Sequence, residues 1–539
     1  MTAGAHPRTL LAINFNHDGA AVLLVEGAIA AYVTTERYSR LKKHPGLREE
    51  DLDELLDQAG ADLDDVDHVL LCNLHLMDSP DVVSMHGSDL KDTWLELWVN
   101  ARNDTVSVRG RRIPCTVNPD HHLLHAAAAY YTSPFGSGVS VAIDPTGCRA
   151  FLGRDNRLYP LRRDFDQWFN ANYGYAHVAH DLFGSALVGA GKVMGLAPYG
   201  APTGAQEVAS PTVTSFAELR ALADADPVLV HADGRALNAR LAYYVQRGLE
   251  QQVQRLFDEL EPICSRNAYQ PTICLSGGSA LNAPATEKAF ARSGFTGLHL
   301  YPACGDDGTA LGAALWYWHD VLGQPRRDFT NAELMYGRRD YGRSAVERVL
   351  DRHAGSLHVE VTADHPARAA ELVAAGSVVG WFEGASEVGP RALGHRSIVA
   401  DPRDPMMRDR LNTQVKYREH FRPFAPAVLH EHALEWFGLR DSPFMLRAAT
   451  ARRDGIPAAV HVDGTARLQT VRAEDSPAFH RLVGCFARLT EVPVVISTSL
   501  NIRGEPIVET PEQAIEALLG SGMTHLIFPG YVVAKEGPR

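Results

Sequence analysis

One group of basic residues in this sequence is of the kind that binds phosphate. It comprises Arg391 and Arg396 in SEVGPRALGHRSIVADP, and Lys416, Arg418 and Arg422 in VKYREHFRPFAP. Glycine and proline interrupt both segments, so these side chains do not keep the helical register of a solvated, salt-bridged face. Arginine forks and a lysine ammonium neutralise phosphate oxygens well. The group therefore predicts an anion site.

A later segment adds hydrogen-bonding groups to this prediction. STSLN places the small polar residues Ser499 and Asn501 at the end of an expected strand. Together with the pair formed by Lys416 and Arg418, they give two cations and two neutral donors or acceptors. This combination favours a small anionic ligand.

A second set of residues has the spacing of metal ligands. His121 and His125 in NPDHHLLHAAAAYY are one turn apart on an expected helix, which the alanine run favours. Alone, such histidines are more often ordinary polar or N-capping residues. Carboxylates complete a set here, from Asp144 on the DPTG turn and from Asp306 or Asp307 before a helix. Two imidazoles and two carboxylates suit Fe²⁺ or another borderline ion such as Mn²⁺ or Zn²⁺.

Three glycine-containing segments resemble loops that bind nucleotides. In SGGSALN, Gly277 and Gly278 separate an expected strand from a helix near Asn282. AGKVMGLAPYG places Lys192 between glycines, and NFNHDGAA places His17 on a turn. Each segment also has a purely structural explanation. SGGSALN could be a common GG turn, AGKVMGLAPYG could be a hinge, and His17 could simply form a turn.

The first part of the chain contains a duplicated pattern that would position these residues. Segment 9–36 runs strand, HDG turn, strand, turn, strand, and segment 138–163 repeats that order with DPTG at its first turn. This is the outline of the actin-like fold, in which the two first turns face each other across a nucleotide phosphate cleft. Two strand-loop-helix units follow, at 271–294 and 297–322.

A charged stretch at 326–353 separates this part from a second α/β part. That second part begins with helix 365–376 and strand 377–384, and it ends with strand 492–501 and the helix-strand pair 511–528. The predicted class is α/β, with an actin-like domain at 1–350 and a smaller α/β domain at 351–539.

Composition limits the classes of function. The 539 residues carry a formal net charge of −13, which argues against a large nucleic-acid footprint. The seven cysteines are scattered without a C-x-x-C pair, which favours a reducing compartment over a zinc ribbon or a disulfide framework. No apolar run is long enough to cross a bilayer. We expect a cytoplasmic protein with no membrane or nucleic-acid partner.

Ten segments, in order along nearly the whole chain, resemble the O-carbamoyltransferase family that includes nodulation protein U, the cephem carbamoyltransferases and the tobramycin-type carbamoyltransferase. They are NHDGAA, TERYSRLKKH, DHHLLHAAAAYYTSPF, GKVMGLAPYG, LSGGSALN, GDDGTALGAAL, SEVGPRALGHRSIVADPR, VKYREHFRPFAP, HVDGTARLQTV and STSLNIRGEPIVETP. Two segments depart from the family pattern. DPTGC replaces an aspartate-glycine-x-glycine-glutamate turn, and STSLN replaces asparagine-threonine-serine-phenylalanine-asparagine.

The resemblance implies an ATP-dependent O-carbamoyltransferase of two parts. The first is similar to the actin-like protein that installs threonylcarbamoyl groups on transfer RNA, and the second to its partner that makes threonylcarbamoyl adenylate. By this likeness, the second domain forms carbamoyl adenylate from carbamoyl phosphate and Mg²⁺-bound ATP. The first domain then transfers the carbamoyl group to a hydroxyl of a small natural product, an antibiotic-type macrolide, glycoside or cephem.

The resemblance also implies roles for individual residues. Carbamoyl phosphate and ATP would bind Arg391, Arg396, Lys416, Arg418, Ser499 and Asn501, with Lys416 and Arg418 also acting in catalysis. The nucleotide in the first domain would contact Lys42, Lys192, Gly277, Gly278 and Asn282. The metal ligands would be His121, His125, Asp144 and Asp306, with Asp307 capping the helix, and His17 would be the general base.

Other readings remain open at this point. A transfer RNA-modifying enzyme is disfavoured by the acidic balance. Hydrogenase cyanide-ligand maturation needs cysteine-rich zinc motifs and an acylphosphatase region, which the sequence lacks. A non-enzymatic actin-like regulator would explain the first domain only. A homodimer is an open alternative for the assembly, and the acceptor alcohol is not specified by the motifs.

Overall fold

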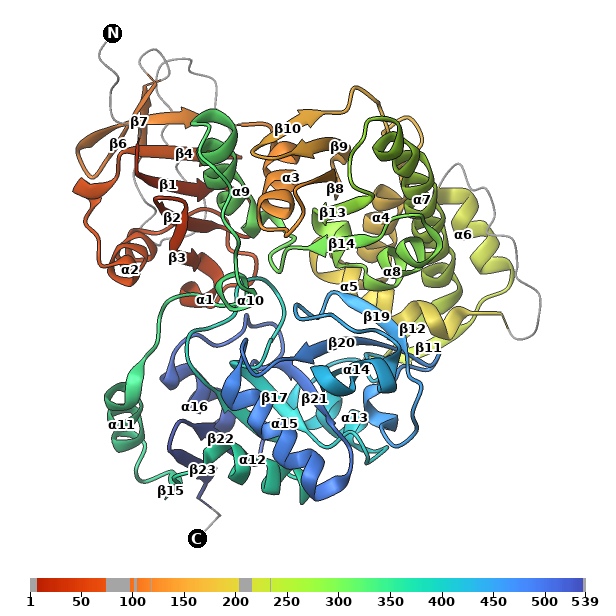
Figure 1. Ribbon diagram of the computed structural model, residues 1–539. Coiled ribbons are helices and arrows are strands. Elements are labelled where there is room, and N and C mark those ends of the chain that lie inside the picture. Colours follow the sequence, from red (N-terminus) through yellow and green to blue (C-terminus); the bar gives the residue numbers. More distant parts are fainter. Residues whose placement is uncertain are drawn as a thin grey trace.

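The computed structural model describes residues 7–73, 97–100, 104–117, 119–202, 216–232 and 234–536. The described residues form three main sheets and a small hairpin (Figure 1). The first sheet has the order β3-β2-β1-β4-β7-β6-β5. Its strands are β1 (Thr9–Asn14), β2 (Ala20–Val25), β3 (Ala28–Thr34), β4 (His68–Cys72), β5 (Leu97–Asn100), β6 (Thr105–Val108) and β7 (Arg111–Val117).

The second sheet repeats the topology of the first. Its order is β10-β9-β8-β13-β14, with β8 (Ser137–Asp144), β9 (Gly147–Arg154), β10 (Arg157–Pro160), β13 (Thr272–Ser276) and β14 (Gly297–Leu300). In both sheets, three antiparallel strands in meander order are followed by two parallel ones. The predicted actin-like duplication is therefore confirmed. The hairpin consists of β11 (Leu229–Ala232) and β12 (Arg235–Asn238).

Helices surround these two sheets. They are α1 (Thr35–Ser39), α2 (Glu49–Ala59), α3 (His121–Tyr131), α4 (Ala171–Phe183), α5 (Ala186–Leu196), α6 (Phe216–Ala225), α7 (Ala239–Arg266), α8 (Ala283–Arg292) and α9 (Thr309–Trp316). Helices α3 and α9 lie side by side between the sheets (Figure 1). A Cβ on Gly312 of α9 would lie 1.9 Å from the carbonyl oxygen of Leu124, so only glycine allows this approach. The close contact brings the start of α9 beside α3.

The second part is built on one mixed sheet of order β15-β23-β22-β16-β17-β21-β18-β20-β19. Its strands are β15 (Leu357–Val361), β16 (Val379–Phe382), β17 (Arg396–Ala400), β18 (Ala425–Leu429), β19 (Arg447–Thr450), β20 (Thr465–Val471), β21 (Val494–Ser499), β22 (His525–Phe528) and β23 (Tyr531–Lys535). Its helices are α10 (Asn331–Met335), α11 (Gly342–Arg352), α12 (His365–Ala374), α13 (Met407–Arg410), α14 (His430–Phe437), α15 (Pro477–Thr490) and α16 (Pro511–Leu519). The predicted α/β class is thus confirmed for both parts.

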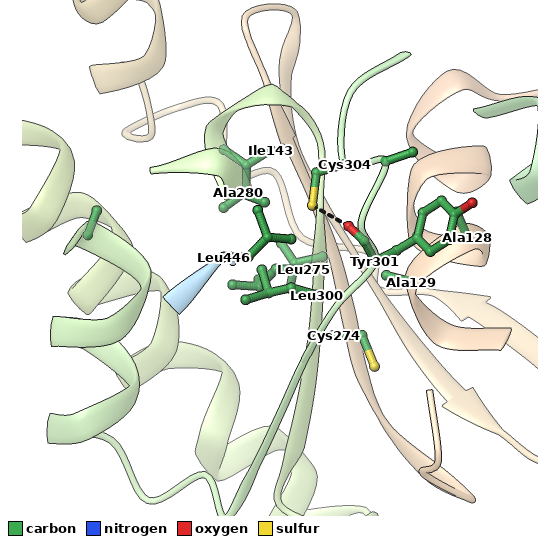
Figure 2. Packing of buried hydrophobic residues seen from close by; sticks show 14 of the residues in the cluster. Ala128, Ala129, Ile143, Cys274, Leu275, Ala280, Leu300, Tyr301, Cys304 and Leu446 are labelled. Atoms are coloured by element: carbon green, nitrogen blue, oxygen red, sulfur yellow. Dashed lines mark hydrogen bonds between the residues drawn. The ribbon is translucent and has the colours of Figure 1, made fainter. Parts of the chain in front are cut away.

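One of the apolar clusters contains residues of both parts. Leu446, just before β19, belongs to the same buried cluster as Leu275 and Leu300 of the second sheet, and Figure 2 shows these side chains together. The division at residue 350 falls inside α11, whose Val346 and Leu350 pack in the core of the second part. That division remains a proposal. Among the described residues, the helices are all too short or too polar to cross a membrane.

Candidate functional site

Four side chains converge at one point in the first part. They are His121 and His125 on α3, Asp144 at the end of β8, and Asp306 on the 3-10 turn before α9. Nε2 of His121 lies 2.9 Å from Oδ2 of Asp144 and 3.9 Å from Oδ1 of Asp306. Nε2 of His125 lies 3.8 Å and 3.4 Å from the same two oxygens. His121, His125 and Asp306 therefore offer ligand atoms within 4.8 Å of one another, as one cation requires, and Asp144 lies beside both histidines.

The local structure explains why these oxygens face inward. Oδ1 of Asp144 accepts hydrogen bonds from N and Oγ1 of Thr146, both at 2.6 Å, and from N of Gly147 at 3.2 Å. Oδ2 of Asp306 accepts from Nδ2 of Asn16 at 2.9 Å. In each carboxylate, one oxygen accepts these hydrogen bonds, and the other oxygen points toward the histidines.

His125 tests whether these residues fit a metal ion. Burial lowers its pKa, so the ring is neutral and one ring nitrogen carries a free lone pair. Its Nδ1 is 3.3 Å from Oγ of Ser276, whereas its Nε2 is buried and forms no hydrogen bond to the described residues. An unpartnered nitrogen facing two carboxylate oxygens is destabilising unless a cation binds there. The donor set fits Fe²⁺, Mn²⁺ or Zn²⁺.

His17, the predicted general base, lies beside this cluster. Its Nε2 is 3.5 Å from Oδ2 of Asp306, and its Nδ1 is 3.1 Å from Oδ2 of Asp18. Lys43 pairs with the same Asp18 oxygen at 2.5 Å. The hydrogen bond with Asp18 raises the pKa of His17. Asp18 thus orients the imidazole so that Nε2 faces the four converging side chains.

The prediction that Asp307 caps α9 is wrong. The N-cap of α9 is Gly308 and no side chain caps this helix. The backbone oxygen of Asp307 accepts a hydrogen bond from Tyr32 at 2.6 Å. Burial, together with the negative charge of Asp18, raises the pKa of the Asp307 carboxyl to about 7. The sequence pattern alone left Asp306 and Asp307 open, and the structure places Asp306 against the histidines.

A cavity of about 370 Å³ lies between the two parts of the chain. Its basic lining residues are Lys42, Arg247, Lys288, Arg391, Arg418, Arg422 and Arg467. Glu250 pairs with Arg247 and Lys288 at 2.7 Å each. The cavity therefore joins basic residues predicted for both nucleotide sites.

Several of these cations lack a counter-charge. Among the described residues, no carboxylate forms an ion pair with Lys42, Arg391, Arg418 or Arg467. Nε of Arg391 and Nε of Arg467 are buried without a hydrogen-bond partner. Burial lowers the pKa of Arg391 to about 10. A guanidinium nitrogen that is buried without a partner is costly, so Arg391 and Arg467 suit the cavity to an anionic ligand.

Lys416, Ser499 and Asn501 meet at one edge of this cavity. Nζ of Lys416 donates to Oγ of Ser499 at 3.2 Å, to Oδ1 of Asn501 at 2.6 Å and to the backbone oxygen of Ser499. Burial and the positive charge of Arg418 lower the pKa of Lys416 well below its ordinary value. Ser499 lines the cavity, whereas Lys416 and Asn501 lie behind it.

Arg396 is fully buried and bonded to the backbone. Its guanidinium donates to the carbonyl oxygens of Glu383 at 2.5 Å, Gly384 at 2.9 Å and Glu509 at 3.2 Å, and it lies 3.5 Å from the ring centre of Phe382. It is not among the residues that line the cavity. The contact of Arg396 with substrate remains a prediction. Its observed hydrogen bonds hold the loop that carries Arg391.

These contacts predict different effects for the two arginines. We expect Arg396→Gln to lower the free energy of unfolding by about 3 kcal/mol, because several buried carbonyls lose their donor. Arg391→Gln should change it by less than about 1 kcal/mol, because that side chain has no protein partner to lose. Urea denaturation of both variants measures this difference. A larger loss in Arg391→Gln would contradict the assignment.

The SGGSALN loop is shaped by close packing on the second sheet. Gly277 has a φ of 89°, and a Cβ there would lie 2.2 Å from the carbonyl oxygen of Ile143. Gly278 faces open space. Asn282 caps α8 and exchanges two hydrogen bonds with Gln246, which lines the cavity. The nucleotide roles predicted for these three loop residues remain predictions.

The two lysines predicted for the first-domain nucleotide lie in different settings. Lys42 lines the cavity. Lys192, on α5, forms an ion pair of 2.8 Å with Glu419 of the second part. The structure therefore brings Lys42 to the cavity, while Lys192 joins the two parts.

Sequence reasoning missed some residues of the site. Arg467 lies on β20, far along the chain from the other cations, and its signal was the family-like segment HVDGTARLQTV. Arg422 was counted in the basic group that predicted an anion site, but it was given no individual role in binding the substrates. Asp18 follows His17 directly in the HDG turn, so an adjacent carboxylate was visible as an orienting group.

Comparisons with known proteins cover both parts. Residues 9–315 match the family described as "Carbamoyltransferase N-terminus", and residues 370–535 match "Carbamoyltransferase C-terminus". Nodulation protein NolNO of Sinorhizobium fredii is 33% identical over 553 residues, which cover 97% of this chain and 79% of that protein. The 3'-hydroxymethylcephem-O-carbamoyltransferase of Streptomyces clavuligerus is 36% identical over 259 residues, 47% of each chain.

The similarity to solved structures is low, both in sequence identity and in TM-score. Full-length HypF in the phosphate- and nucleotide-bound form is 12% identical with a TM-score of 0.30, and the match covers 59% of this chain and 47% of that one. The activator of the 2-hydroxyisocaproyl-CoA dehydratase from Clostridium difficile is 13% identical with a TM-score of 0.34, over 58% of this chain and 96% of that one. These values do not bear on function.

Proposed function

This chain belongs to the carbamoyltransferase family, and on that premise we propose that it is an ATP-dependent O-carbamoyltransferase that acts on a hydroxyl of a small natural product. The observation that carries the proposal is the cavity between the two parts, which is lined by cations without carboxylate partners, including Arg391 and Arg467 with their buried and unpartnered Nε atoms. Carbamoyl phosphate and ATP are anions of the kind that such a cavity would bind.

The proposed first half-reaction takes place among these cations. Carbamoyl phosphate is cleaved by water to carbamate and phosphate, and a carbamate oxygen then attacks the α-phosphorus of Mg²⁺-bound ATP. The bond to the β-phosphate oxygen breaks, which yields carbamoyl adenylate and pyrophosphate. Arg391, Arg418 and Arg422 would neutralise the phosphate oxygens. Lys416 would hold Ser499 and Asn501 in place at the edge of the cavity. No proton transfer by the protein is needed at phosphorus.

The proposed second half-reaction takes place at the His121 cluster. A divalent ion held by His121, His125, Asp144 and Asp306 would act as a Lewis acid on the carbamoyl carbonyl. The acceptor oxygen attacks the carbamoyl carbon, the bond to the AMP oxygen breaks, and His17 takes the hydroxyl proton on Nε2. Asp18 holds the other nitrogen of this ring, as in other oriented imidazole bases.

The first half-reaction gives the direct test. With ATP, carbamoyl phosphate and Mg²⁺ but no alcohol, we expect pyrophosphate and phosphate to be released in equal amounts, because no acceptor group enters this step. Enzyme-coupled pyrophosphate detection, with ATP alone as the control, measures it. If no pyrophosphate appears in any condition, including with antibiotic, glycoside and macrolide alcohols, the adenylate route is wrong.

A further inference from the structure

Asn73 connects the metal-site histidine to the first sheet. It directly follows β4 and has a φ of 57°, a left-handed conformation that asparagine adopts more readily than most residues. Its Oδ1 is 2.8 Å from Nδ1 of His121, the ring nitrogen that does not face the carboxylates. Asn73 therefore contacts a predicted metal ligand from behind.

The hydrogen-bond network fixes which way this amide points. Nδ2 of Asn14, at the end of β1, donates to the backbone oxygen of Asp18 at 3.1 Å, and a carbonyl oxygen can only accept. Oδ1 of Asn14 must then accept, and Nδ2 of Asn73 donates to it at 2.7 Å. Nδ2 of Asn73 also reaches Oγ1 of Thr309 at 3.4 Å. The amide nitrogen of Asn73 is thereby committed, so its oxygen faces His121.

This orientation decides the tautomer of His121. An amide oxygen only accepts, so Nδ1 of His121 must carry the ring proton. In the neutral ring that binds a metal ion, the lone pair is then on Nε2, which lies 2.9 Å from Oδ2 of Asp144. We propose that Asn73 is a positioning residue of the metal site, which fixes the Nδ1–H tautomer and the ring orientation of His121 so that Nε2 binds the ion. This inference rests on the proposed metal site.

Asparagine is suited to this position for two reasons. Its oxygen accepts from His121 while its nitrogen donates to Asn14, so a single side chain makes both contacts. The network also ends on Asp18, which holds the candidate base His17. One chain of amides thus links the metal ligand to the turn that carries the base.

Metal affinity tests the proposal without reference to turnover. We expect Asn73→Gly to weaken Co²⁺ binding to the metal-stripped protein by about 10- to 100-fold, the usual cost of losing such a partner, and to alter the Co²⁺ absorption spectrum. Glycine tolerates the left-handed backbone, so this variant removes the amide without adding strain. Glu491→Gly is the matched control, since Glu491 has a φ of 62° at the end of α15 in the second part. It should bind Co²⁺ like the wild type.

A second variant separates the hydrogen bond from a general structural role. Asn73→Asp keeps an oxygen acceptor for Nδ1 of His121, so its Co²⁺ affinity should stay within about threefold of the wild type. Wild-type affinity in Asn73→Gly, or an equal loss in both variants, would overturn the proposal. If Asn73→Gly does not fold, Asn14→Ala provides the test, because it removes the hydrogen-bond partner that fixes the orientation of the Asn73 amide. Unchanged Co²⁺ affinity in Asn14→Ala would also overturn the proposal.

The metal site and the role of Asn73 fail in different ways. If the wild type binds no Co²⁺ or Zn²⁺, the metal site itself is wrong and the inference falls with it. If the wild type binds and Asn73→Gly binds equally well, only the inference is wrong.

Discussion

Replacing Lys416 by alanine is expected to reduce pyrophosphate release by about 1,000-fold, whereas replacing His121 by alanine should leave it unchanged and stop carbamoyl transfer. Nζ of Lys416 is bonded to Ser499 and Asn501 beside the cavity, while His121 lies in the converging cluster of the first part. Arg418→Ala, which removes a cavity-lining cation, should resemble Lys416→Ala. Pyrophosphate release and carbamoylated product, measured on the same samples, distinguish the two steps.

Chemically supplied carbamoyl adenylate provides the control for this division of labour. It should restore product formation in Lys416→Ala and not in His121→Ala, because only the first variant lacks the intermediate. Lys416 is buried, so Lys416→Met, which keeps most of the volume, checks that the loss is not due to unfolding. Lys535→Ala, at a lysine of β23 bonded to the carbonyl of Ser521, should retain both activities. Equal rescue of both site variants would refute the assignment.

The sequence predicted those features that depend on local pattern. The alanine-rich segment after Asp120 forms α3 as expected, so the one-turn spacing of His121 and His125 places both rings on one face. The repeated order of turns and strands predicted the two matching sheets. This pattern indicated a carboxylate from the turn at Asp144 and one from the start of α9, whereas the choice of Asp306 over Asp307 came from the resemblance to the family.

The direction of individual side chains was not predictable in the same way. Arg391 and Arg396 share one glycine-rich segment, and both were assigned to the anion site. In the structure, Oε1 of Glu387 accepts three backbone hydrogen bonds from Leu393, His395 and Arg396, and this arrangement folds the loop. Arg396 is then buried against carbonyls, while Arg391 faces the cavity. Such hydrogen bonds within an irregular loop leave no periodic signal in the sequence.

Pairing across the two parts was equally hidden. Lys192 lies between glycines and was expected to contact a nucleotide, yet its partner Glu419 is far away in the chain. The prediction that Asp307 caps α9 was wrong because of the local backbone. The backbone of α9 begins with a 3-10 turn, so Gly308 takes the cap position.

The metal content of four variants gives the second large expected effect. Wild-type protein should copurify with about one Fe²⁺, Mn²⁺ or Zn²⁺ per chain. His125→Ala should lose at least about 90% of it, because the unpartnered Nε2 of His125 is replaced by a cavity without a donor. Asp306→Asn should lose more metal than Asp307→Asn, because Oδ1 of Asp306 faces His125 at 3.4 Å, whereas Asp307 forms no ion pair with either histidine ligand. Elemental analysis of the purified proteins measures all of these.

His122 is the matched control within the same helix. Its Nε2 is 3.4 Å from Oδ1 of Asp144, the oxygen already held by Thr146, so this imidazole supports the carboxylate without facing the converging atoms. His122→Ala should therefore keep most of the metal, with a loss of affinity smaller than that of His125→Ala. Unchanged metal content in His125→Ala, or a greater loss in Asp307→Asn than in Asp306→Asn, would show that the ligands are assigned wrongly. A loss in His122→Ala as large as in His125→Ala would instead add a third histidine to the coordinating set.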